Sequence, residues 1–476
     1  MDLDQREKLR VAAEPAVLVG CYLPGEEEAH GGDERDPLRE LRALAETAGS
    51  RVVGELVQRR VRPRPSTYLG KGKMEELTAM IEALKAKLVV FDNDLSPNQI
   101  REIEKAVSCK VLDRSELILD IFAGRASTRQ AKLQVEIAQL EYTAPRLRAM
   151  WSHLGQVTGG APVGVGTRGP GEQQIETDRR LVQRRLLQLK RELAEVQARK
   201  TREVEGRRLE HYTVGIVGYT NAGKSTLFNA LTRGGAFAHG KLFATLGTRV
   251  EQWNLGGGNS AMLSDTVGFI RNLPHHLVAS FRSTLEETVH AHLLLVVADA
   301  SDPAAEQELR TVHEVLAEID ADRQPRVLVL NKIDAADAAT LAKWREREPE
   351  AIQVSAKSGE GLELLRAIVL RNMMGAVREV DATVPLNDDR TIDFLEKRAD
   401  VLDRRYADGT VTLRVRLGRR QLEQLLSRGT AARIDGLPAQ EALRQVWDPS
   451  PVAAPLRVPP HLRYDQMRDE ADKEHA

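Results

Sequence analysis

The feature that most constrains this chain is the segment Gly218-Tyr-Thr-Asn-Ala-Gly-Lys-Ser225. It matches the pattern G-x-x-x-x-G-K-[ST], follows the apolar stretch Val214–Val217 and precedes the helical stretch Thr226–Leu231. Glycines let backbone N–H groups turn inward around phosphates, and the N-terminus of the following helix adds positive potential. We therefore predict that Lys224 contacts the β- and γ-phosphates of a nucleotide and that the Ser225 hydroxyl binds Mg²⁺.

A second motif, Asp265-Thr-Val-Gly268, follows the apolar stretch Ala261–Leu263. We expect Asp265 to hold Mg²⁺ through a water molecule and the Gly268 N–H to contact the γ-phosphate. Between the two motifs lies the sequence Phe-Ala-Thr-Leu-Gly at positions 243–247. Its Thr245 is predicted to close over the γ-phosphate and to complete the Mg²⁺ shell, with Thr248 as the alternative for this role.

Recognition of the base is predicted from Asn331-Lys-Ile-Asp334, which ends the apolar strand Val327–Leu330. A carboxylate at Asp334 can accept hydrogen bonds from guanine N1–H and N2–H₂, and adenine offers neither donor. The segment Ser355-Ala-Lys357 ends the next strand and is expected to supply a backbone N–H to guanine O6. The predicted nucleotide-binding residues are Gly218, Tyr219, Thr220, Asn221, Ala222, Gly223, Lys224, Ser225, Thr226, Phe243, Ala244, Thr245, Leu246, Gly247, Asp265, Thr266, Val267, Gly268, Asn331, Lys332, Ile333, Asp334, Ser355, Ala356 and Lys357.

The residue after the second motif is Phe269, where many regulatory GTP-hydrolysing proteins carry a glutamine that orients the attacking water. A phenylalanine cannot hold a water molecule. One interpretation is that Phe269 packs this segment against its domain. The other is that intrinsic hydrolysis is slow and a partner supplies the missing group. No other residue of the sequence is a convincing catalytic base, so no catalytic residue is assigned.

The chain has 476 residues, which at roughly 150 residues per domain predicts about three domains. Strands alternate with helices from Ala16 to Leu112 and again from Tyr212 to Met374. A helix at Asp393–Leu402 and a strand at Thr410–Leu417 indicate a smaller α+β domain. The expected fold is an α/β multidomain protein, with an α/β subdomain (1–114), a helical hairpin with a glycine-rich loop (115–210), a P-loop GTPase domain (211–375), a small α+β domain (376–432) and a proline-rich, charged tail (433–476).

One helix carries a concentrated positive charge. Residues 179–208 contain eleven Lys and Arg against four acids, and the apolar positions 182, 186, 189, 193 and 196 have the spacing of a coiled-coil seam. These charges could simply belong to a helix face that is exposed to solvent. Their excess over the acids instead favours RNA binding, mainly by contacts to the RNA phosphates. The candidate RNA contacts are Arg168, Arg179, Arg180, Arg184 and Arg185.

Composition excludes several classes of protein. The 69 Lys and Arg nearly balance the 70 Asp and Glu, which excludes a uniformly basic nucleic-acid binder. The two cysteines, Cys21 and Cys109, cannot form a disulfide framework or a cysteine zinc cluster. No apolar run approaches the ~18 residues that a membrane span needs. We therefore expect a cytoplasmic protein.

Three segments, Tyr68–Leu77, Asp113–Leu140 and Gly164–Arg180, closely resemble the HflX family of ribosome-associated GTPases. The resemblance covers about residues 15–430. It implies GTP-dependent binding to the large ribosomal subunit and its rRNA, ribosome-stimulated hydrolysis of GTP to GDP and phosphate with Mg²⁺, and dissociation of stalled or idle ribosomes under stress. The resemblance also implies ATP binding through the amino-terminal part. No motif in this sequence indicates such a site. Gly247 departs from the aspartate expected in the family, which weakens the assignment of Thr245.

Two other functions stay open at this point. One is a nucleotide-gated rRNA-binding scaffold in which hydrolysis is incidental, and Phe269 is the feature that favours it. The other is a GTPase of ribosome assembly that acts on precursor rRNA, which the basic hairpin also allows.

Overall fold

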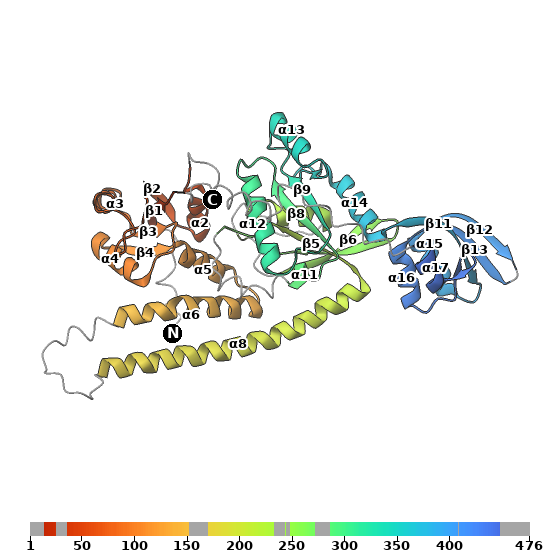
Figure 1. The fold of residues 1–476 in the computed structure, drawn as a ribbon, viewed down its shortest axis with the longest axis horizontal. Coiled ribbons are helices and arrows are strands. Elements are labelled where there is room, and N and C mark those ends of the chain that lie inside the picture. The colour runs from red at the N-terminus through yellow and green to blue at the C-terminus, as the bar shows by residue number, and fades with distance from the viewer. Residues whose placement is uncertain are drawn as a thin grey trace, which may run out of the picture.

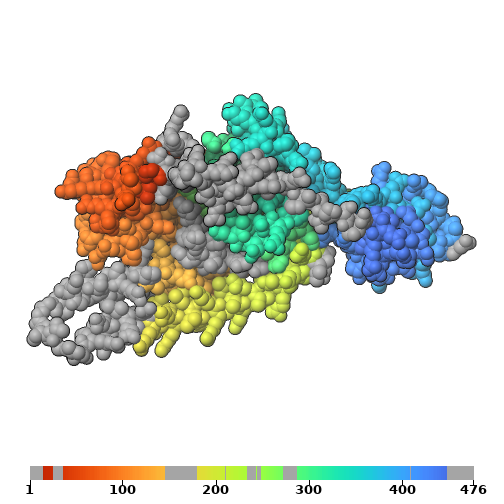
Figure 2. Space-filling model, in the orientation of Figure 1, coloured from red at the N-terminus to blue at the C-terminus, as the bar shows by residue number. Residues whose placement is uncertain are grey.

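The structure, a computed structural model, describes residues 14–24, 36–151, 170–232, 243, 248–271, 286–407 and 409–447. Three sheets and a helical hairpin follow one another along an elongated molecule (Figure 1). The amino-terminal sheet and the carboxy-terminal sheet lie at opposite ends, as the space-filling view also shows (Figure 2). Within the described ranges, no helix combines the length and the apolar character needed to cross a membrane.

The first sheet is fully parallel, with strand order β2-β1-β3-β4. Successive residues of β1 point to opposite faces, and both faces are apolar: Ala16 and Leu18 belong to one buried cluster and Val17 and Val19 to another. Helices therefore cover both faces, as expected for a parallel sheet. The elements are β1 (Pro15–Tyr22), α2 (Arg39–Ala48), β2 (Arg51–Arg59), α3 (Lys71–Leu84), β3 (Leu88–Phe91), α4 (Pro97–Val107), β4 (Lys110–Asp113) and α5 (Arg114–Arg125).

The helical hairpin consists of α6 (Arg129–Trp151) and α8 (Pro170–Glu210), which lie side by side (Figure 1). The predicted seam is confirmed, because Leu189 and Leu193 of α8 are buried against Leu133 and Ile137 of α6. Two ion pairs flank the seam, Arg185 Nη2–Glu136 Oε1 at 2.8 Å and Lys190 Nζ–Glu141 Oε1 at 2.7 Å. The loop that joins the two helices lies outside the described residues.

The second sheet has the order β10-β9-β8-β5-β7-β6, with β6 antiparallel to β7 and all other pairs parallel. β5 is central, so the loop at its carboxyl end lies in the middle of the sheet edge. The elements are β5 (Tyr212–Gly218), α9 (Lys224–Thr232), β6 (Arg249–Gly256), β7 (Asn259–Asp265), α11 (Glu286–Val289), β8 (Leu293–Asp299), α12 (Ala305–Glu318), β9 (Arg326–Asn331), α13 (Ala338–Arg347), β10 (Ile352–Gln353) and α14 (Leu362–Met374).

The third sheet is antiparallel, with the order β12-β13-β11-β14-β15. The predicted end of this domain at residue 432 is too early, because β14 pairs with β11 and the side chains of Ala439 and Trp447 are buried in the same core. The elements are β11 (Val377–Pro385), α15 (Asp389–Arg398), β12 (Asp400–Ala407), β13 (Thr410–Gly418), α16 (Arg419–Ser427), β14 (Arg433–Ile434), β15 (Leu437–Pro438) and α17 (Ala439–Gln445).

The predicted helix at Asp393–Leu402 is displaced in the structure, where it begins at Asp389 and gives way to strand β12 at Asp400. Its start is fixed by Asp388, whose carboxylate accepts a hydrogen bond from the Thr391 backbone N–H. Such an N-cap satisfies a donor that the first turn of a helix leaves without an intrahelical partner. The prediction from the sequence did not include this N-cap, and so it began the helix four residues too late.

Candidate nucleotide-binding site

The glycine-rich loop lies between β5, which ends at Gly218, and α9, which begins at Lys224. Both outer glycines are required by close contacts. A Cβ at Gly218 would lie 2.2 Å from the Val297 carbonyl oxygen, and one at Gly223 would lie 2.3 Å from Asn331 Nδ2. Both residues also have φ in the left-handed region, +152° and +90°. The strand, turn and helix predicted from the motif are therefore present.

Lys224 is buried at the start of α9, with only 7% of its surface exposed. Its Nζ donates a hydrogen bond to the Tyr219 carbonyl oxygen at 2.6 Å. Burial lowers the pKa of Lys224 to about 8, and the nearby carboxylate of Asp265 opposes this shift. A buried ammonium group beside a ring of backbone amides is suited to bind a polyphosphate.

Ser225 and Asp265 come together from two different motifs. The Ser225 hydroxyl donates to Asp265 Oδ2 at 2.7 Å, and Asp265 is 1% exposed. Hydroxyl and carboxylate oxygens are the hard ligands that Mg²⁺ prefers. The donor set therefore fits a magnesium ion held partly by these residues and partly by phosphate and water.

Asn331 joins the glycine-rich loop to the last predicted motif. Its Nδ2 donates to the Ala222 carbonyl oxygen at 2.9 Å, and its Oδ1 accepts from the Ala356 N–H at 3.0 Å. The neighbouring Lys332 pairs with Asp299 at the end of β8, with 2.6 Å between Nζ and Oδ2. Four segments of the chain thus meet at one edge of the sheet.

Asp334 lies on the same edge and is oriented by Ser355. The Ser355 hydroxyl donates to Asp334 Oδ1 at 2.6 Å, and this hydrogen bond holds the pKa of Asp334 below its ordinary value. An ionised carboxylate is an acceptor on both oxygens. Asp334 is therefore an ionised acceptor, as the predicted pairing with guanine requires.

Phe269 packs into the domain, in agreement with the first interpretation of this residue. It is 3% exposed, its N–H donates to the Gly218 carbonyl oxygen at 3.1 Å, and its own carbonyl accepts from the Thr220 N–H at 2.7 Å. The Asp265–Gly268 segment consequently lies directly against the glycine-rich loop. A Cβ at Gly268 would be 2.7 Å from Lys224 Nζ. Whether a partner supplies a catalytic group stays a prediction.

Residues 244–247, and with them Thr245, lie outside the described residues. The preceding residue, Phe243, is buried and makes an edge-to-face contact with Phe122 of α5, with ring centroids 4.6 Å apart. The alternative, Thr248, accepts a hydrogen bond from Lys200 Nζ of α8 at 3.2 Å. The two ends of this segment are therefore attached to two different parts of the chain.

Helix α8 also contacts α11, which follows Phe269 along the chain. Arg207 of α8 forms an ion pair with Glu287 of α11, with 2.6 Å between Nη1 and Oε1. Of the RNA candidates, Arg168 and the side chain of Arg179 lie outside the described residues, Arg180 and Arg184 are exposed, and Arg185 is paired with Glu136. Helix α8, which carries the basic residues, thus contacts Thr248, which directly follows residues 243–247, and Glu287, which lies near the amino ends of β5 and β8.

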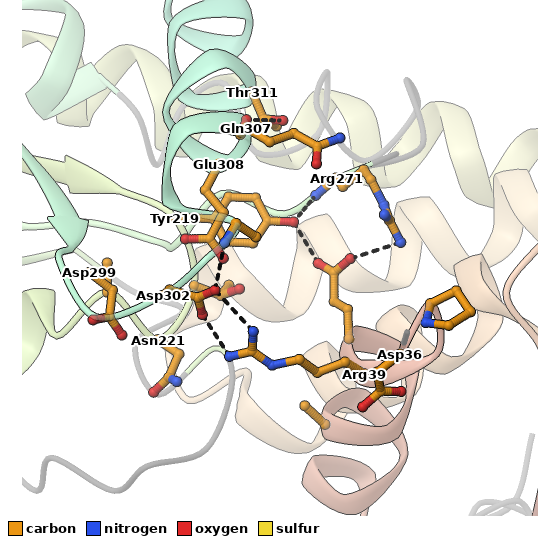
Figure 3. A pocket seen from close by; sticks show the side chains of 16 residues that line it. Asp36, Arg39, Tyr219, Asn221, Arg271, Asp299, Asp302, Gln307, Glu308 and Thr311 are labelled. Atoms are coloured by element: carbon orange, nitrogen blue, oxygen red, sulfur yellow. Dashed lines mark hydrogen bonds and ion pairs between the residues drawn. The ribbon is translucent and has the colours of Figure 1, made fainter. Parts of the chain in front are cut away.

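Sequence reasoning missed a set of charged residues between the first and second sheets. Tyr219 OH donates to Glu40 Oε1 at 2.6 Å, and Glu40 also pairs with Arg114 at 2.9 Å and with Arg271 at 3.2 Å. Figure 3 shows the ring of Tyr219 and the side chain of Arg271 close to each other, beside a pocket bordered by Arg39 and Asp302. No motif or periodicity marks these residues as a set, because they come from five separate segments.

Family models match the chain in four consecutive stretches. They are described as a GTP-binding GTPase N-terminal region (residues 35–123), a GTP-binding GTPase middle region (125–207), a 50S ribosome-binding GTPase (213–332) and an HflX C-terminal domain (340–433). Together they include β2 to β4 of the first sheet, nearly all of the second sheet and β11 to β13 of the third.

Curated relatives align over most of their own length. A protein named GTPase HflX from Lacrimispora saccharolytica is 44% identical over 77% of this chain and 85% of its own. A protein of the same name from Escherichia coli K12 is 39% identical over 85% of this chain and 94% of its own. Among solved structures, the SsGBP–GDP complex is 26% identical, with a TM-score of 0.44, over 75% of this chain and 98% of that one.

Proposed function

Because this chain belongs to the HflX family of GTPases, which hydrolyse GTP, we propose that residues 218–357 form its GTP site and that GTP controls its binding to the large ribosomal subunit. The observation that carries this proposal is the position of Asn331. Its side chain links Ala222 of the glycine-rich loop to Ala356, and so sets the phosphate end and the base end of the site at a fixed separation.

The roles proposed for the site follow from its chemistry. Lys224 and the loop amides bind the β- and γ-phosphates, and Asp334 accepts the guanine N1–H and N2–H₂. Mg²⁺ would be held by Ser225 directly and by Asp265 through water, with Thr245 completing the shell. When bound, the ion offsets the charge that develops on the phosphates.

We propose that the bound nucleotide controls ribosome binding by changing the position of α8. Lys200 contacts Thr248, which directly follows residues 243–247 with the predicted Thr245, and Arg207 contacts Glu287, which follows the Asp265–Gly268 motif along the chain. Segments that close on a γ-phosphate change position when it is released. Such movement would shift α8 and its exposed basic residues, including Arg180 and Arg184, relative to rRNA phosphates.

The specific outcome that we propose is dissociation of stalled or idle ribosomes under stress, by a cytoplasmic protein that is partly associated with ribosomes. The domain limits at residues 114, 210 and 375 are part of this proposal, with the hairpin at 115–210 as the ribosome-contacting unit. ATP binding at the amino-terminal region is a subordinate hypothesis.

The test is sedimentation of whole ribosomes with the purified protein in GTP, GDP or no nucleotide, at two salt concentrations. We expect the protein to sediment with large subunits mainly in GTP, and whole ribosomes to decrease in its presence. Loss of binding as salt rises supports phosphate contacts by the hairpin. Equal binding in all three nucleotide states contradicts GTP control, and binding to immature subunits only would instead indicate an assembly factor.

A further inference from the structure

A water molecule that attacks the γ-phosphate has to be oriented by a polar group, and the side chain of Phe269 offers none. Its ring is buried, and its backbone is held to the glycine-rich loop by two hydrogen bonds. The orienting group must therefore lie close to Lys224 and Gly268, the two residues that are expected to contact the γ-phosphate.

Thr220 is the residue of the loop that meets this condition. It is 5% exposed, and within the part of the chain that the structure describes its Oγ1 has no hydrogen-bond partner. Buried hydroxyl groups are nearly always hydrogen-bonded in native proteins, so an exception calls for an explanation. A ligand or a reacting water that binds at this point is such an explanation.

Thr220 also lies where the reacting groups meet. A Cβ placed on Gly268 would be 2.9 Å from Thr220 Cγ2 and 2.7 Å from Lys224 Nζ, so the three residues converge on one small volume. Thr220 N–H donates to the Phe269 carbonyl oxygen at 2.7 Å, which fixes its backbone between the loop and the Asp265–Gly268 segment.

The pocket drawn in Figure 3 has Thr220 among its lining residues. Thr220 and Asn221 border that pocket together with Glu308 of α12 and Arg39 of α2. Burial raises the pKa of Glu308 to about 8, so this carboxyl group is largely protonated at neutral pH and is a poor acceptor for a water proton. Arg39 is held by Asp302, with 2.6 Å between Nη2 and Oδ2. Of the hydroxyl groups on the described residues that line this pocket, Tyr219 OH is bonded to Glu40 and Thr311 Oγ1 to the Gln307 carbonyl oxygen, whereas Thr220 Oγ1 has no such partner.

We propose that the Thr220 hydroxyl orients the attacking water in GTP hydrolysis, accepting a hydrogen bond from the water and donating one to a γ-phosphate oxygen. The water oxygen forms a bond to the γ-phosphorus while the bond from that phosphorus to the β–γ bridging oxygen breaks. The electron pair of the broken bond stays on GDP. One water proton remains on the phosphate product and the other passes to solvent. This inference rests on the GTPase activity of the family and not on the ribosomal target.

The experiment compares Thr220→Val, which removes the hydroxyl at nearly constant volume, with Thr220→Ser, which keeps it. Single-turnover hydrolysis is measured on the isolated full chain, without ribosomes. For Thr220→Val we expect a rate lower by on the order of 10- to 100-fold, with the affinity for a fluorescent GDP analogue unchanged. For Thr220→Ser we expect a rate within about threefold of the unaltered protein.

Ser264→Ala is the matched control, because it removes another buried hydroxyl of the same domain, which donates to the Val214 carbonyl oxygen at 3.3 Å. Its hydrolysis rate should not change. If Thr220→Val does not fold, Thr220→Ala replaces it in the same comparison. A normal rate in the variant that lacks the hydroxyl overturns the proposal, as does a loss confined to nucleotide affinity or an equal loss in Thr220→Ser. Failure of ribosome binding alone leaves this result unaffected.

Discussion

Arg271, two residues beyond Phe269, forms an ion pair with Glu40 of α2, with 3.2 Å between Nη2 and Oε2. The same guanidinium is 3.6 Å from Oδ2 of Asp92, which directly follows β3, and Arg114, which directly follows β4, donates to the Arg271 carbonyl oxygen. Sheets of this kind bind ligands beyond the carboxyl ends of their strands. Here that position is occupied by side chains of the GTPase domain, so the first domain contacts the segment that follows Gly268.

The central cation of this network is Arg114, and its removal should strongly destabilise the protein. Arg114 is 2% exposed and lies 2.7 Å from Asp92, itself 1% exposed. Removing one partner of such a pair leaves a buried charge uncompensated, which costs about 3–5 kcal/mol. We expect Arg114→Ala to lower the free energy of unfolding by about this amount in urea titrations. Arg199→Ala, which breaks an exposed pair with Glu203, should cost less than about 1 kcal/mol. Equal losses for both variants contradict the prediction.

Base preference should depend on Asp334. Substitution Asp334→Asn replaces an acceptor by a donor and so reverses the match to guanine N1–H and N2–H₂. We expect GTP affinity to fall by on the order of 100-fold or more, and affinity for xanthosine triphosphate to rise. Competition against a fluorescent GDP analogue measures both. Asp337→Asn, whose parent residue caps α13 nearby, is the control, and it should leave the preference for guanine intact. Unchanged GTP binding by Asp334→Asn would argue against this base-recognition site.

Affinity for GTP should fall as the pH rises through about 8, the pKa of Lys224 in the free protein. Below this pH Lys224 carries its positive charge. Above it the free protein has lost that proton, and binding of a polyphosphate must take it up again, so affinity falls by up to about tenfold per pH unit. Glu308, with a pKa of about 8, gains negative charge over the same range and acts in the same direction. Calorimetry from pH 6.5 to 9 measures the affinity and the proton uptake.

The variant Glu308→Gln separates the two groups in the pH experiment. It removes the carboxyl contribution and leaves the fall that is due to Lys224. A dissociation constant that is independent of pH in both proteins contradicts the prediction.

Coupling between nucleotide and ribosome should weaken when α8 loses its side-chain contacts to Thr248 and Glu287. We expect the double substitution Lys200→Ala and Arg207→Ala to preserve GTP affinity while it reduces the difference in ribosome binding between GTP and GDP, because the removed contacts join α8 to residues that follow, along the chain, the two segments expected to respond to the γ-phosphate. Co-sedimentation in the two nucleotides measures this difference. Arg202→Ala together with Arg199→Ala removes the same charge from exposed positions of the same helix. If the control pair has the larger effect on this difference, charge rather than contact explains the binding.

The strand, glycine turn and helix around residues 212–232 were predictable from the sequence, as was the seam between α6 and α8. Both depend on short-range geometry: glycine spacing fixes the turn, and a repeat of four and three residues fixes one face of a helix. The motifs that contain Asp265, Asn331 and Asp334 were also predictable, because each follows an apolar strand and the carboxyl ends of parallel strands meet at one sheet edge. The structure brings them together as that rule requires.

The tertiary structure alone decided which residues lie across the site from these motifs. Tyr219 and Glu40 are 179 positions apart, and no periodic pattern connects two single side chains at that separation. The same holds for the buried Phe269, for the hydroxyl of Thr220, which has no hydrogen-bond partner among the described residues, and for Trp447, which is buried in the core of the third sheet. Local sequence determines turns and helix faces, whereas contacts between distant segments depend on the packing of whole domains.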